Sequence, residues 1–112
     1  MAIGQAGVAR GEVYLVRLDP TQGSEIRKTR PCLVVSPDEL NENLRTVMVA
    51  PMTTGGQACP WRVRCRFQGR NGSVATDQLR TVDIERLARR LGRLAPNSVT
   101  RVLTVLQEMF AP

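Results

Sequence analysis

The 112-residue sequence contains no histidine, a single lysine and only four aromatic residues. Without histidine, any general acid or base must be another side chain or water. The three cysteines, Cys32, Cys59 and Cys65, have no C-x-x-C spacing, so they offer no zinc site, and no metal site is expected elsewhere. An odd number of cysteines favours reduced thiols in a cytoplasmic protein.

Long apolar runs are also missing. No apolar stretch approaches the roughly 20 residues that a membrane-spanning helix needs. The first ten residues, M-A-I-G-Q-A-G-V-A-R, lack the basic start and long apolar segment of a secretory signal. We therefore expect a cytoplasmic protein with no membrane contact, and the length favours one domain over residues 1–112.

Positive charge is plentiful. Sixteen basic residues against ten acidic ones give a net charge of +6, and fifteen of the sixteen are arginine. Such a surface attracts nucleic acids, acidic proteins or anionic membranes. Arginine binds phosphate through a planar two-pronged fork, although a codon preference for arginine explains the choice over lysine equally well.

The apolar pattern predicts strands followed by one helix. Expected strands cover residues 11–19, 32–36, 46–52, 61–67, 73–77 and 80–83. Residues 38–44 are expected to form a short helix or loop, and residues 68–72 a hairpin loop. Helical spacing of apolar residues predicts an amphipathic helix from about Pro96 to Phe110. The order predicts a mainly β, α+β fold, with a strongly bent sheet or barrel packed by a C-terminal helix.

Residues 61–67 read W-R-V-R-C-R-F, which places apolar residues on one face of a strand and three arginines on the other. The arginine face either binds RNA or an acidic partner, or is simply solvated. Trp61 and Tyr14 share the apolar alternation, so core or interface positions are favoured over base stacking. Phe110, at the end of the helix, is expected in the core or a dimer contact.

The segment G-S-E-I-R-K-T-R-P, Gly23 to Pro31, surrounds one acid, Glu25, with Arg27, Lys28 and Arg30. A surface ion pair is one interpretation. Pro31, however, favours an extended Arg30 at the start of a buried strand, and Thr53 and Thr54 follow another central strand. If the two strands are neighbours, arginine and threonine hydroxyls can meet at one phosphate.

Three segments resemble the MazF/PemK (Kid) family, the endoribonuclease toxins of type II toxin–antitoxin systems. They are R-G-E-V-Y-L-V-R-L-D-P-T-Q-G-S-E-I-R-K-T-R-P-C-L-V-V-S (Arg10 to Ser36), V-M-V-A-P-M-T-T-G (Val47 to Gly55) and S-V-A-T-D-Q-L-R-T-V-D (Ser73 to Asp83). The resemblance runs from about residue 10 to residue 110 and implies an SH3-like, plasmid-toxin fold of the MazF/CcdB type.

The resemblance also implies site residues. The catalytic arginine and threonine fall on Arg30 and Thr53, and a loop glutamate on Glu25. Thr54 is expected to contact RNA, and the RNA groove or its border is expected at Asp77, Gln78 and Arg80. By their charge alone, Arg27 and Lys28 either follow the RNA phosphates or are simply solvated. Departures from the family pattern fall in the Gln57–Pro60 loop and on the arginine face, where such toxins select their RNA target.

The implied reaction is cleavage of single-stranded RNA by its own 2′-OH. It leaves a 2′,3′-cyclic phosphate and a 5′-OH, needs no metal or cofactor, spares DNA and inhibits translation and growth. The implied partners are a second copy of the chain and an acidic antitoxin. Two alternatives stay open: a CcdB-like poison of DNA gyrase, or a homologue that binds RNA or antitoxin without cutting.

Overall fold

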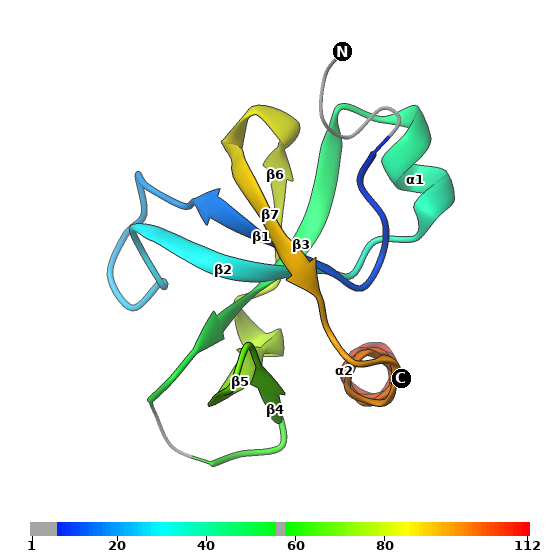
Figure 1. Ribbon diagram of the computed structural model, residues 1–112. Helices are drawn as coiled ribbons and strands as arrows, with labels where there is room; N and C mark the ends of the chain where they lie inside the picture. Colours follow the sequence, from blue (N-terminus) through cyan, green and yellow to red (C-terminus); the bar gives the residue numbers. More distant parts are fainter. Residues whose placement is uncertain (1–6, 56–57) are drawn as a thin grey trace.

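The computed structural model describes residues 7–55 and 58–112 (Figure 1). Its elements in chain order are β1 (Glu12–Arg17), β2 (Thr29–Val34), α1 (Asp38–Asn43), β3 (Thr46–Thr53), β4 (Arg62–Phe67), β5 (Arg70–Ala75), β6 (Arg80–Asp83), β7 (Leu87–Arg93) and α2 (Pro96–Phe110). Short 3₁₀ turns η1 (Thr76–Gln78) and η2 (Ile84–Arg86) lie on either side of β6. The chain is thus mainly β, with a C-terminal helix.

The strands form one bent antiparallel sheet. Their order is β4-β5-β3-β2-β1-β7, with β6 paired to the first half of β3. Among the described strands the two ends of this order, β4 and β7, are not paired with each other, so the sheet bends without closing into a barrel. This confirms the predicted fold class and selects the open form.

The central strands are buried on both faces, which explains why their sequences are continuous apolar runs. Alternate residues of one strand enter different clusters: Tyr14 and Val16 join one, and Val13 joins the other. Strand β2 does the same with Cys32 and Leu33. The first cluster is closed by the β6–β7 region of the bent sheet, and the second by helix α2 and strand β4.

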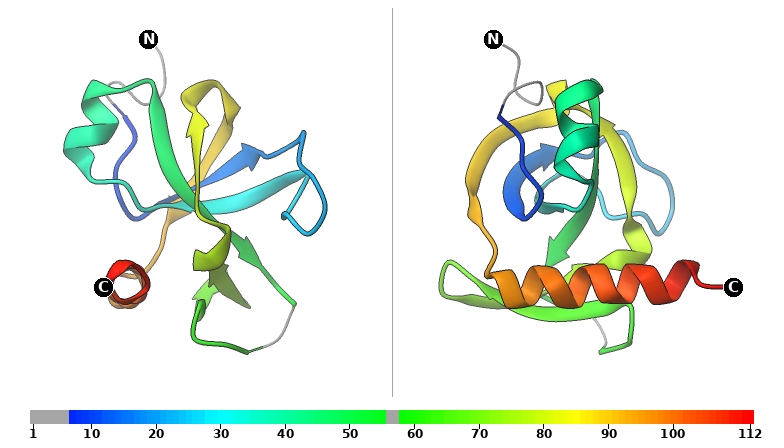
Figure 2. Two further views of the ribbon diagram at one scale, coloured as in Figure 1. Left: turned by 180° about the vertical axis from the view of Figure 1, so that it is seen from behind. Right: turned by 90° about the vertical axis from the view of Figure 1, so that its right-hand side faces the viewer.

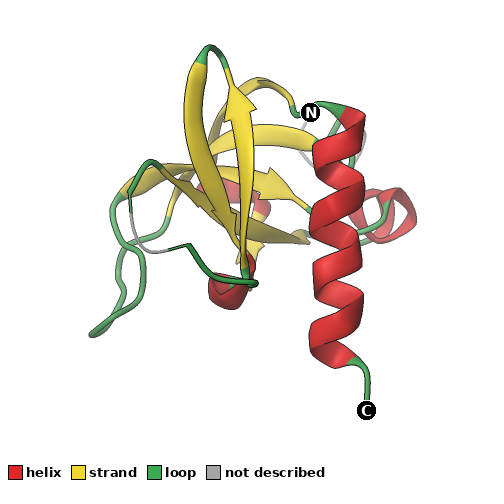
Figure 3. Ribbon diagram, turned by 90° about the horizontal axis from the view of Figure 1, so that it is seen from below, coloured by secondary structure: helices red, strands yellow, loops and turns green. Residues whose placement is uncertain are grey.

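Helix α2 covers the second cluster along its length. The right-hand view of Figure 2 shows it crossing in front of the green strands β4 and β5, and Figure 3 shows it lying against one side of the sheet. Val102 and Leu106 are its buried contacts, and Pro96 occupies its first turn, where a missing N–H costs nothing. The helix bounds predicted from the sequence are confirmed.

Strand β3 changes partner halfway along. Residues Thr46–Val49 pair with β6, whereas Met52 and Thr53 pair with β5. Pro51 lies in the interval between the two partners, where a residue without an N–H is tolerated. The change divides the sheet into a part that contains β6 and a part that contains β4 and β5, and β3 belongs to both.

The structure adds to or corrects the expectations at three places. Residues 68–72 are not all loop: Gln68 and Gly69 alone form the turn, both with positive φ (51° and 77°), and β5 already begins at Arg70. Strand β7 was not predicted, because it pairs only with β1 and buries only Leu87. Trp61 has 47% of its surface exposed, which excludes the core and leaves an interface as the predicted position.

The cysteines and helices match the sequence analysis. Cys32 and Cys65 are buried, and all three cysteines are free thiols. In the described part of the chain, no helix combines the length and hydropathy needed to span a bilayer.

Candidate active site

Arg30 and Thr53 come together at the ends of two neighbouring strands. In the β2–β3 ladder Cys32 pairs with Pro51 and Leu33 with Ala50. The same register, continued past Cys32, sets Arg30 across from Thr53. Pro31 and the buried residues that follow hold this end of β2 in place, so the arginine projects from a rigid strand.

Both residues line one cavity of about 370 Å³. Its walls come from β2, the end of β3, the β4–β5 hairpin and β7. The apolar wall consists of Pro31, Met52, Cys65, Phe67 and Leu91, and the polar groups are Arg30, Thr53, Thr54, Gln68, Arg70 and Asn71, with Gly72 between them. No described lining residue is acidic, so the cavity has the charge and size of an anion-binding pocket.

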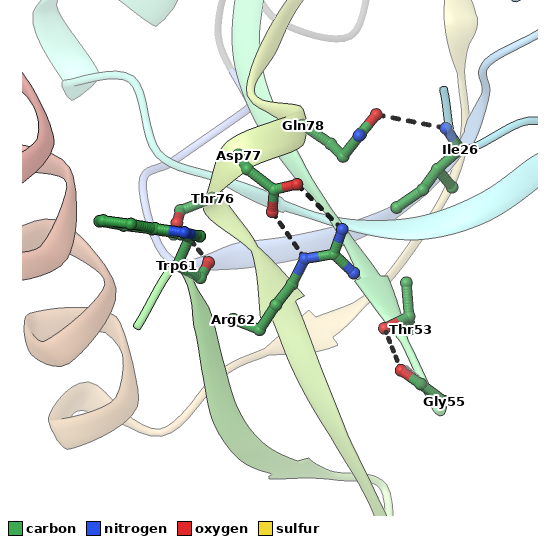
Figure 4. A network of polar contacts seen from close by, with 8 residues as sticks. All are labelled: Ile26, Thr53, Gly55, Trp61, Arg62, Thr76, Asp77 and Gln78. Carbon is green, nitrogen blue, oxygen red and sulfur yellow. Dashed lines mark hydrogen bonds and ion pairs between the residues drawn. The ribbon is translucent and has the colours of Figure 1, made fainter. Parts of the chain in front are cut away.

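The side-chain polar groups of Arg30 and Thr53 make few hydrogen bonds to the described residues. Arg30 donates its Nε–H to the Arg27 carbonyl at 3.3 Å, and no other side-chain hydrogen bond of its guanidinium is made to the described residues. The Thr53 hydroxyl donates to the Gly55 carbonyl at 3.2 Å (Figure 4). The two Nη groups of Arg30 are therefore left for a ligand, and Thr53 can donate to one after a χ1 rotation.

Glu25 lies apart from this cavity, in the exposed β1–β2 loop. Its Oε1 accepts a hydrogen bond from the Gln22 backbone N–H at 2.6 Å, and the described residues show no ion pair between Glu25 and Arg30. Arg27 and Lys28 are exposed in the same loop, and Lys28 has a φ of 70°. The predicted cluster of one acid and three cations is thus spread along a loop.

Gln78 and Arg80 hold that loop from the other side. Gln78 accepts from the Ile26 N–H at 3.3 Å (Figure 4), and Arg80 donates to the Leu18 carbonyl at 3.2 Å. Asp77, the third residue expected near the groove, forms a two-pronged ion pair with Arg62, at 2.6 and 2.9 Å. Each of these three side chains therefore has a protein partner.

The Arg62–Asp77 pair and the buried thiols set the local charge. Hydrogen bonding from Arg62 lowers the pKa of Asp77, so this carboxylate stays ionised. It neutralises one arginine of the arginine face, called below the β4 stripe, which consists of Arg62, Arg64 and Arg66. Burial raises the pKa of Cys65, which therefore contributes a neutral thiol to the cavity wall. Burial also raises the pKa of Cys32 to about 12.

The sequence analysis missed three polar side chains of the cavity: Gln68, Arg70 and Asn71. They lie on the β4–β5 hairpin, which was expected to be a five-residue loop. The Gln68 amide donates to the Leu91 carbonyl at 2.9 Å and ties the hairpin to β7. The segment that follows Gly69, R-N-G-S-V-A, has no apolar alternation, so the sequence held no clear signal for a strand that begins at Arg70.

The chain is similar to known proteins in sequence and in fold. The chain is 37% identical over 105 residues to endoribonuclease PemK of Escherichia coli, covering 88% of this chain and 79% of that protein. The crystal structure of MazF (Form-I) from Deinococcus radiodurans superposes with a TM-score of 0.81 at 25% identity, covering 91% and 94% of the two chains. A mycobacterial endoribonuclease in complex with its cognate antitoxin superposes with a TM-score of 0.80 at 24% identity, over 95% and 98%.

These similarities in sequence and fold therefore place the chain in the MazF-like class of small toxins. A family model described as "PemK-like, MazF-like toxin of type II toxin-antitoxin system" matches residues 9–110, and the chain belongs to this family.

Proposed function

We propose that this toxin is a sequence-specific endoribonuclease that cuts single-stranded RNA at the Arg30–Thr53 cavity. The observation that supports this most strongly is that Arg30 and Thr53, from different strands, line one cavity whose described lining residues include no carboxylate. A guanidinium with unoccupied Nη groups is suited to a phosphodiester. The kinship to endoribonuclease PemK supports the same reaction class.

The proposed reaction uses the ribose 2′-OH as nucleophile. A bond forms between the 2′-oxygen and phosphorus, and the bond from phosphorus to the 5′-oxygen breaks. The products are a 2′,3′-cyclic phosphate and a 5′-OH. DNA lacks the 2′-OH and is not cut. The 2′-OH proton passes to a base, and the leaving 5′-oxygen takes a proton from an acid or from water.

Arg30 stabilises the charge that develops on the phosphoryl oxygens, and Thr53 donates a hydrogen bond to the same group. Glu25 is the proposed base or the residue that orients Arg30. Its carboxylate must first give up the Gln22 N–H, so its role requires a rearrangement of the β1–β2 loop. Arg27, Lys28 and Thr54 contact flanking phosphates in this scheme.

Partners follow from the charge and the family. A net charge of +6 suits an acidic antitoxin, and a mycobacterial relative is solved with its cognate antitoxin. We further propose that the toxin acts as a homodimer in the cytoplasm, where the three free thiols are stable.

The test is digestion of a long mixed-sequence RNA and its DNA counterpart, with EDTA present, followed by mapping of the cut ends. Wild type should cut RNA alone, at a short recurring motif, and leave cyclic phosphates. Arg30→Ala should lose at least about 10²-fold in rate. Arg89→Ala, which removes an exposed arginine of β7 outside the cavity, should cut like wild type.

Wild-type-like cutting by folded Arg30→Ala would refute the assignment of Arg30. Absence of cutting by folded wild type would refute the nuclease itself, and an assay for inhibition of DNA gyrase would then be the next step.

A further inference from the structure

A second cavity, of about 380 Å³, adjoins the first. It is lined by Gly55, Arg64 and Ser73, and four residues line both cavities: Thr54, Cys65, Asn71 and Gly72. The two cavities therefore lie next to each other along β5, and together they are called the hollow. This hollow leads from the Arg30–Thr53 pair to Arg64.

The arginines of β4 are not equivalent in this setting. Arg62 is engaged by Asp77 through two hydrogen bonds. Arg64 lines the second cavity, whereas Arg66 lines neither, although both are exposed on the same strand. The stripe that the sequence analysis left with an open role thus has one member directed to the hollow.

Asn71 stands where the two cavities meet. Its amide carries both donors and an acceptor, the combination that pairs with the edge of a base. The wall beside it includes Cys65 and, in the first cavity, Phe67 and Met52, and an apolar wall is what a base face requires. Gly72, which follows, lines both cavities, and its lack of a side chain lets the backbone of β5 lie close to Thr53.

We propose that this hollow is the subsite for the nucleotide next to the cleaved phosphate, with Asn71 reading its base and Arg64 binding the following phosphate. The inference rests on the proposed nuclease function and deepens it. It assigns target selection to the β4–β5 hairpin, in addition to the loops that flank the site.

The first experiment tests Arg64. An RNA oligonucleotide that contains the mapped cut site, with a 2′-deoxy sugar at the attacking position, binds without being cut. Its affinity for the full-length protein is measured by fluorescence anisotropy at several salt concentrations. Arg64→Ala should weaken binding about five- to tenfold and reduce the slope of log K against log salt by about 0.7. Arg66→Ala is the matched control and should change neither.

Equal effects of Arg64→Ala and Arg66→Ala would overturn the proposal, because they would indicate general attraction by the whole stripe. No effect of Arg64→Ala on an oligonucleotide that wild type binds would also overturn it, while leaving the nuclease intact.

The second experiment tests Asn71. Asn71→Ala and wild type digest the same random-sequence RNA, and the cut positions are compared. In the variant, the preference for one base over the others at one position beside the cut should fall by about 5- to 100-fold. The cut ends should still be cyclic phosphates. An unchanged cut motif, or a uniform fall in rate at every site, would overturn the base-reading role. Failure of wild type to cut any RNA would instead reject the proposed function, and this proposal with it.

Discussion

At the scale of single residues, Gly72 controls how closely β5 approaches the end of β3. A Cβ added at Gly72 would lie 2.5 Å from the backbone oxygen of Thr53, a distance that real side chains do not adopt. The glycine is needed for this close approach, since its φ is not in the left-handed region. The position of Thr53 therefore depends on the absence of a side chain one strand away.

Gly72→Ala should displace Thr53 and lower kcat for RNA cleavage by about 10- to 100-fold, because small misplacements of a reacting group are costly. The measurement is the single-turnover cleavage rate, with the thermal unfolding midpoint as a check of folding. Gly7→Ala is the matched control, because an added Cβ there meets none of the described residues within 4 Å. A Gly72→Ala protein with the wild-type rate would show that Thr53 tolerates the shift or is not required.

At the scale of elements, the β1–β2 loop is held by neighbours that are far away in sequence. Gln78 binds the Ile26 N–H, Arg80 binds the Leu18 carbonyl, and Arg86 donates to the carbonyls of Arg17 and Asp19 at 3.0 and 2.7 Å. The turn η1 and strand β6 thus limit the motion of the loop that carries Glu25.

Gln78→Ala should release the middle of this loop. Trypsin cuts after arginine and lysine, so cleavage after Arg27 and Lys28 should become about two- to tenfold faster when one hydrogen bond is lost. The cut sites are identified by mass spectrometry after brief digestion. Gln107→Ala, an exposed position on α2, is the control and should digest like wild type. Unchanged digestion of the loop in Gln78→Ala would mean that Arg80 and Arg86 suffice.

The elements also show where sequence reasoning works. The runs C-L-V-V and T-V-M-V-A-P-M predicted two buried strands, and the meeting of Arg30 and Thr53 was expected on the condition that these strands are neighbours. The pairing of β2 with β3 meets that condition. What could not be predicted were partners supplied by tertiary structure. Strand β7 has no apolar alternation of its own, and the engagement of Asp77 by Arg62 depends on the pairing of β4 with β5.

The resemblance added roles that the strand pattern alone does not contain. It placed Glu25 among the catalytic residues, and the structure finds its carboxylate bonded to its own loop. The local sequence cannot show whether Glu25 points toward Arg30 or bonds to its own loop, because an exposed loop permits both orientations of the side chain. Part of the loop expected to select RNA, Gln57, lies outside the described residues.

At the scale of the whole molecule, the packing of α2 accounts for one of the two cores. Leu106 is 9% exposed within the second cluster, whereas Phe110, one turn further on, is 71% exposed. The two residues lie on the same helix and differ mainly in burial, so they form a natural pair for measuring what the packing contributes.

Leu106→Ala should lower the free energy of unfolding by about 2–4 kcal/mol through lost burial and the cavity left behind. Phe110→Ala should change it by less than about 0.5 kcal/mol, as exposed substitutions do. Urea unfolding at two protein concentrations measures both. A large loss in Phe110→Ala that depends on concentration would contradict this expectation for the isolated chain and indicate that another copy covers Phe110.

Leu91 forms part of the wall of the first cavity and is one of the later residues to be synthesised, which has a consequence for when the cavity is completed. Arg30 and Thr53 are synthesised early, but the Gln68 amide finds its acceptor only when Leu91 is in place. During translation, a chain that extends to Gly55 already carries Arg30 and Thr53, the proposed catalytic pair, but lacks the wall that Leu91 gives to their cavity. Activity should therefore switch on abruptly, only after β7 has been synthesised and has paired with β1.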